Sequence, residues 1–172
     1  MTVNSFELEI AHINGWLTGL GQLCHGMNYI PHYNAMIFRP SLNDIKADIL
    51  QAISSKANAR FSETYECNDI EFIPHWEEYL HDSIDRWVIK RILGGQQNST
   101  INYPIDNYLS YLHTNTANRL AWLIREAMKS IEPEVWKFKI CHGYCHQYGF
   151  ENEAYAFKSV DRGLIITFGW GD

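Results

Sequence analysis

Carboxylates dominate one segment of this chain and could hold a basic partner. Between Arg60 and Arg86, twenty-five residues include no Lys or Arg but eight carboxylates, Glu63, Glu66, Asp69, Glu71, Glu77, Glu78, Asp82 and Asp85. The formal net charge of the chain is -6, so this segment contributes -8 and the remainder +2. A local field of one sign steers and orients an oppositely charged partner. We therefore expect a binding surface for a basic macromolecule.

The spacing of apolar residues after Pro74 predicts a helix that runs to Leu93, where a Gly94-Gly95 pair ends it. Glu77 and Glu78 lie near its start, where the helix dipole favours negative charge. The buried face of this helix is predicted to hold Trp76, Leu80, Ile84, Trp87 and Val88. The outer face is then shared by Glu78, Asp82 and Asp85.

We predict that this outer face binds the partner. Glu78 and Asp82 form a like-charge pair four residues apart, which costs about 0.2 to 0.5 kcal/mol in an isolated helix. Only Arg86 offers Asp82 a local compensating charge. The alternative is a solvated face that happens to be acidic. The predicted partner-binding residues are Glu71, Glu78, Tyr79, Asp82 and Asp85, with Tyr79 as an aromatic anchor.

A second group of residues has the chemistry of metal ligands. The segment Cys141-His142-Gly143-Tyr144-Cys145-His146 holds two thiols and two imidazoles, which are soft ligands for zinc. Its spacing argues against a structural site, because such sites draw ligand pairs from two separated knuckles. Cys24-His25 could provide the missing second pair of ligands if the fold brings the two segments together. We expect no cofactor, and a metal-dependent enzyme or zinc-binding domain centred on Cys141 to His146 remains the alternative.

Other function classes have weak support in the sequence. The chain has no Gly-x-Ser-x-Gly elbow, no His-Glu-x-x-His and no glycine-rich phosphate loop, so we do not expect an enzyme. A sequence pI near 5.7 disfavours direct binding of nucleic acid. The first residues lack the basic start and the unbroken apolar run of a signal peptide, and no stretch of the sequence approaches the length of a membrane span. We therefore expect a cytoplasmic protein with reduced cysteines.

The elements that position these residues are predicted as an α+β arrangement in a single domain, 1–172. Helices are expected over 5–23, from Ser41 to about Ser54, over 74–93 and after Pro104, with 35–39 extended and 61–73 loop-like or partly extended. Strands are expected over 135–140, 153–158 and 163–168. The prediction is a mainly helical N-terminal three quarters, about 1–132, followed by a small C-terminal antiparallel sheet, about 133–172.

The chain resembles small bacterial immunity proteins, especially those of contact-dependent growth inhibition systems. The resemblance rests on the acidic chain without catalytic motifs and on two closing strands, Trp136-Lys137-Phe138-Lys139-Ile140 and Gly163-Leu164-Ile165-Ile166-Thr167-Phe168-Gly169. It implies a one-to-one complex with a cognate toxin, frequently a nuclease with a basic surface. No binding residue is transferred by the resemblance, so the site residues above follow from charge alone.

Overall fold

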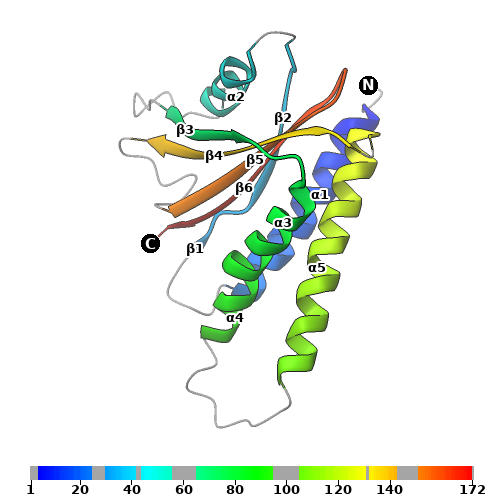
Figure 1. The fold of residues 1–172 in the computed structure, drawn as a ribbon, viewed down its shortest axis with the longest axis vertical. Helices are drawn as coiled ribbons and strands as arrows, with labels where there is room; N and C mark the ends of the chain where they lie inside the picture. The colour runs from blue at the N-terminus through cyan, green and yellow to red at the C-terminus, as the bar shows by residue number, and fades with distance from the viewer. Residues whose placement is uncertain are drawn as a thin grey trace.

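A computed structural model describes residues 4–24, 30–41, 44–55, 65–94, 105–130, 132–142 and 151–171 (Figure 1). Its helices are α1 (Ser5–Cys24), α2 (Ile45–Ser54), α3 (Trp76–Ile84), α4 (Lys90–Gly94) and α5 (Ile105–Met128), with a π-helical segment, Asp85–Ile89, between α3 and α4. Its strands are β1 (Ile30–Pro31), β2 (Asn34–Phe38), β3 (Tyr65–Phe72), β4 (Glu134–His142), β5 (Glu151–Lys158) and β6 (Gly163–Gly171). None of these helices is long and apolar enough to cross a lipid bilayer.

The described strands form one antiparallel sheet with the order β1-β6-β5-β4-β3, and β2 also pairs with β6. Helices α1, α3 and α5 lie together on one face, and α2 lies on the other (Figure 1). On β5, Tyr155 and Phe157 belong to the core under the three helices, whereas Ala154 and Ala156 belong to the core under α2. Burial on both faces explains why the central strands are apolar over most of their length.

The prediction of a helical N-terminal three quarters followed by a small C-terminal sheet is wrong. The fold is α+β, but the sheet has six strands among the described residues, and β1, β2 and β3 all precede Ile73. β2 is extended because it pairs along β6, with Ala35 opposite Ile166 and Phe38 opposite Gly163. The extended segment expected over 35–39 is present as β2. Its pairing joins segments far apart in the sequence, so local patterns did not show that it belongs to the same sheet as the C-terminal strands.

The start of the second helix differs from expectation. The N-cap of α2 is Asp44, whose carboxylate accepts a hydrogen bond from the Ala47 amide at 3.1 Å. Ser41 lies before the helix, and its hydroxyl accepts from the Asp44 amide at 3.4 Å. Ser and Asp are both typical N-cap residues, and here Asp44, which directly precedes the first helical residue, is the N-cap. The helix expected after Pro104 is α5, which is continuous through Thr114.

The helix expected after Pro74 is interrupted by the π-helical segment. It begins at Trp76 and ends at Gly94, close to the predicted bounds, but residues 85–89 widen the turn. A π-turn inserts an extra residue and changes which side chains face the sheet. Here Arg86 contacts Glu153 on β5 at 2.7 Å, rather than the expected partner Asp82.

Candidate functional site

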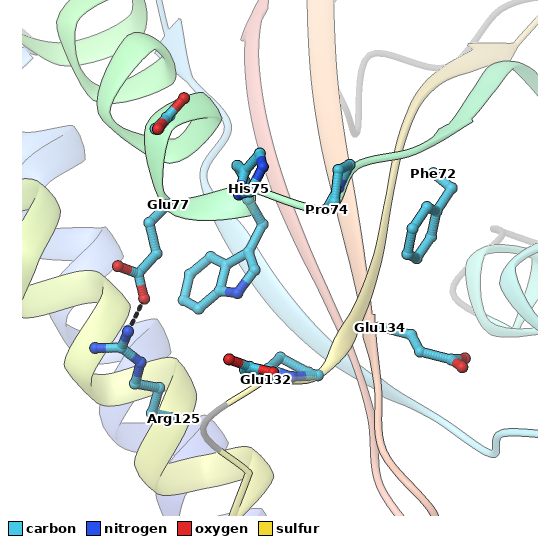
Figure 2. A pocket seen from close by; sticks show the side chains of 10 residues that line it. Phe72, Pro74, His75, Glu77, Arg125, Glu132 and Glu134 are labelled. Carbon is cyan, nitrogen blue, oxygen red and sulfur yellow. Dashed lines mark ion pairs between the residues drawn. The ribbon is translucent and has the colours of Figure 1, made fainter.

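A hollow of about 580 Å³ lies between the turn that links β3 to α3 and the start of β4 (Figure 2). Four carboxylates line it, and we call it the acidic hollow: Glu77, Glu78, Glu132 and Glu134. Arg125 from α5 is the cation among the described lining residues. Three segments distant in the sequence thus contribute charge to one concave surface.

Local structure explains how the acidic hollow forms. The Ile73 amide donates a hydrogen bond to the Val135 carbonyl at 2.9 Å, which holds the end of β3 beside the start of β4. Pro74 then turns the chain away from the sheet, and α3 begins at Trp76. The Trp76 ring is buried and packs edge-on against Phe157, with the ring centroids 5.2 Å apart. This aromatic contact fixes the first turn of α3 against the core.

Most of the negative charge in the acidic hollow is not neutralised by the described part of the chain. Glu77 forms an ion pair with Arg125, drawn as a dashed line in Figure 2. Glu78, Glu132 and Glu134 are exposed and have no ion pair among the described residues. Ionised carboxylates only accept hydrogen bonds, and the strongest that they form are charge-assisted bonds from Lys and Arg. The hollow is therefore suited to a basic side chain.

An aromatic surface adjoins the carboxylates. Phe72 lines the hollow and is 54% exposed, and its ring packs edge-on against Trp136 with centroids 5.7 Å apart. The Lys158 ammonium lies 6.0 Å from the centroid of the Trp136 ring. An exposed aromatic beside polar groups is a common arrangement at protein interfaces.

The structure brings only part of the predicted site together. Glu78 and Asp82 are both exposed on α3, one turn apart, and of the predicted residues only Glu78 lines the acidic hollow. Asp85 forms an ion pair with Lys90 at 2.8 Å, so its charge is partly compensated. Glu71 lies opposite Lys137 in the β3–β4 register and lines a different hollow of about 290 Å³.

Tyr79, the predicted anchor, lies at the boundary between the surface and the core. Its side chain is half-buried and packs against the core under the three helices. The Lys137 ammonium lies 5.5 Å from its ring centroid, in the range of a cation–π contact. The Tyr155 hydroxyl oxygen lies 3.4 Å from the Tyr79 backbone carbonyl oxygen. The ring is therefore held in place by contacts within the fold.

Sequence reasoning missed Glu132 and Glu134. These two residues are more than fifty positions from Glu78 in the sequence, so the sequence does not show that they lie near it. The hydrogen bond between Ile73 and Val135 brings them beside α3. A local signal was present, since the two carboxylates flank Pro133 immediately before a strand.

Sequence reasoning also missed a buried network around Glu153, which is 4% exposed. One carboxylate oxygen accepts hydrogen bonds from the Ser83 hydroxyl and, at 2.6 Å, from the Tyr155 hydroxyl. The other contacts Arg86 at 2.7 Å and Lys137 at 3.1 Å. Burial acts to raise the pKa of Glu153, but the hydrogen bonds from Ser83 and Tyr155 and the charge of Lys137 outweigh it, so the pKa lies below its ordinary value. The sequence did contain a signal, because Glu153 is two residues from Tyr155 and four from Phe157 in a predicted strand, which places the carboxylate on the same side as these aromatic residues.

The metal alternative finds no support within the described residues, which contain no group of three or more candidate ligands. Cys141 is exposed at the end of β4, and its sulfur accepts a hydrogen bond from the Asn68 amide at 3.3 Å. Cys145, His146, His25 and the side chain of His142 lie outside the described residues. Cys24 is fully buried, and burial raises the pKa of its thiol, which disfavours the thiolate that zinc requires.

We call the acidic hollow and the neighbouring outer face of α3 together the acidic surface, whose exposed carboxylates are Glu78, Asp82, Glu132 and Glu134. It combines exposed carboxylates, an aromatic residue and a concave shape. Comparison of the chain with protein-family models, with curated proteins and with solved structures found no match.

Proposed function

We propose that this protein is an immunity protein that binds and neutralises a cognate bacterial toxin domain through the acidic surface. The observation that carries the proposal is the set of exposed carboxylates Glu78, Asp82, Glu132 and Glu134, which lack a cation partner among the described residues. The toxin domain is of the nuclease class, because a nuclease needs clustered Lys and Arg to hold phosphates. The protein acts in the cytoplasm, without catalysis and without a cofactor.

The negative charge of the acidic surface would both raise the rate of association with the toxin and block the toxin's binding of nucleic acid. A surface of one sign raises the association rate with an oppositely charged partner by tenfold to about a thousandfold at low salt. A Lys or Arg side chain that enters the acidic hollow would meet Glu78, Glu132 and Glu134, with Phe72 at its side. The same toxin residues would otherwise bind nucleic-acid phosphate, so occupying them blocks substrate.

The test begins with the product of the gene immediately upstream. Its C-terminal domain is expressed with and without this protein, and growth and co-purification are measured. We expect a stable complex and rescued growth. Absence of both would remove the immunity proposal.

The site is tested with a matched pair of double variants. Glu78→Gln with Asp82→Asn removes two carboxylates from the acidic surface, and Glu7→Gln with Glu126→Gln removes two exposed carboxylates from α1 and α5. Both change the net charge equally. At low salt we expect the first variant to associate about tenfold more slowly and the second to be nearly unchanged, with the difference shrinking at high salt as charges are screened. Equal effects would show that total charge, not this surface, matters.

A further inference from the structure

The outer face of α5 exposes a large aromatic residue. Trp122 is 45% exposed, and the Arg119 guanidinium lies 4.2 Å from the centroid of its ring. A guanidinium over an aromatic face is attracted to it, so the contact favours one orientation of the exposed ring. Arg119 is also the one Asp, Glu, Lys or Arg in residues 110–124 of the sequence. Trp is highly buried on average, so an exposed Trp on a helix face with little charge is a candidate binding residue.

Two contacts between α3 and α5, which lie side by side in Figure 1, place Trp122 beside the acidic surface. Asn118 and Arg125 share one stripe of α5 with Trp122, four residues before it and three after it. The Asn118 side-chain oxygen lies 3.2 Å from Nε2 of His81, and Arg125 forms an ion pair with Glu77. The earlier residue of α5 thus meets the later residue of α3, so the two helices run antiparallel here. Trp122 is therefore level with the segment of α3 between Glu77 and His81.

The exposed ring and the exposed carboxylates of α3 form one continuous surface. Glu78 lies within that segment of α3 and Asp82 directly follows it, and both are exposed. Tyr111 lies eleven residues before Trp122 on the same stripe of α5 and is 68% exposed. On α3 itself, Tyr79 is half-buried and packs against the core. α3 therefore supplies the charge of this surface, and α5 supplies exposed aromatic area.

We propose that the outer face of α5 binds the same toxin domain as the acidic surface, with Trp122 as the aromatic anchor of the complex. This inference rests on the proposed function and adds the residue that holds the partner once the carboxylates have attracted it. Charge complementarity selects the occupant, because Glu78 and Asp82 beside the ring favour a basic surface, and the face of a Trp ring also attracts Lys and Arg. Residues that dominate binding energy at interfaces are enriched in Trp, with polar groups around them.

The two parts of this surface act on different rate constants. Long-range charge changes the association rate, whereas contacts that form only in the docked complex change the dissociation rate. Trp122→Ala should therefore raise the dissociation rate constant at least about tenfold and change the association rate constant by less than about twofold. The effect should persist at high salt, because contact with an aromatic side chain is not screened as the attraction between exposed charges is. Glu78→Gln with Asp82→Asn should show the opposite division, with slower association.

Surface plasmon resonance with the immobilised C-terminal domain of the upstream gene product measures both rate constants. The control is Leu8→Ala, since Leu8 is 58% exposed and lies on α1, outside the acidic surface. We expect this variant to bind as the wild type does. Trp122→Phe keeps an aromatic ring and should recover part of the affinity that Trp122→Ala loses. Circular dichroism and the urea midpoint verify that each variant is folded.

The outcomes separate this inference from the proposed function. If the wild type binds the toxin domain and Trp122→Ala dissociates at the same rate, the anchor assignment is wrong and the immunity function stands. Equal weakening by Leu8→Ala would also overturn the assignment, because loss of any exposed apolar side chain would then suffice. If the wild type does not bind the toxin domain, the proposed function fails, and the anchor assignment fails with it.

Discussion

Replacing Glu153 by Gln tests whether the buried network stabilises the fold. The amide has the shape of the carboxylate but no charge, so Arg86 and Lys137 lose their partner. Breaking a buried ion pair costs about 3–5 kcal/mol when the remaining charge is uncompensated. Here the side chains of Arg86 and Lys137 are 54% and 26% exposed, so water solvates part of the freed charge. We therefore expect the free energy of unfolding to fall by about 2–3 kcal/mol, which is at or below the lower limit for a fully buried pair.

Urea denaturation followed by tryptophan fluorescence and circular dichroism measures this loss. The midpoint should fall while the m-value stays constant, because the buried surface is nearly unchanged. Glu151→Gln is the control, since Glu151 precedes Glu153 by two residues on β5 and is exposed, and its replacement should change stability by less than about 0.5 kcal/mol.

A double-mutant cycle with Lys137→Met isolates the pairwise contribution. If the ion pair matters, removing Lys137 should cost less in the Glu153→Gln background, with a coupling energy of at least about 1 kcal/mol. Additive effects, or a loss below about 1 kcal/mol for Glu153→Gln alone, would refute the reasoning.

Three further predictions concern acid stability, cysteine reactivity and the close contact at Gly163. The pKa of Glu153 is lower in the folded protein than in the unfolded chain, where it is about 4.3, so the ionised carboxylate stabilises the fold above that pH. This contribution is lost as the pH falls through the folded pKa. The free energy of unfolding should therefore depend less steeply on pH below about pH 4 to 5 in Glu153→Gln than in the wild type, and an unchanged slope would contradict this. Exposed Cys141 should react with iodoacetamide in the native protein while Cys67, whose pKa burial raises to about 12, stays unmodified in peptide mapping; modification of both at similar rates would show that β3 opens readily. Gly163→Ala should destabilise the fold by about 1–3 kcal/mol in urea denaturation, because a Cβ there would lie 2.6 Å from the Phe38 backbone oxygen, and a neutral effect would mean that β2 shifts away at no cost.

Local patterns in the sequence predicted several elements and one part of the site. The periodicity of apolar residues located α1 and the start of α3, because an amphipathic helix carries its signal within a few turns. The alternation of residues in 135–140 and 153–158 likewise predicted β4 and β5. The exposed pair Glu78 and Asp82 was also accessible from helical spacing alone.

Pairing across the sheet was not accessible from local patterns. β2 is a strand because it lies along β6, and β3 is an edge strand because it lies along β4. Each contact joins residues far apart in the chain, and its stability depends on a partner that a local window does not contain. The size of the sheet was underestimated for this reason.

The sequence by itself determined the sign and the concentration of charge, the helical spacing of Glu78 and Asp82, and the supply of apolar residues for one core. Only the tertiary structure decided that Glu77 is neutralised by Arg125, and Glu153 by Arg86 and Lys137. It also decided that Glu132 and Glu134 join Glu78 in one hollow. The physical reason is that composition fixes the number of charges, whereas their interaction depends on distance and burial, which only the packing of α3 and α5 against the sheet sets.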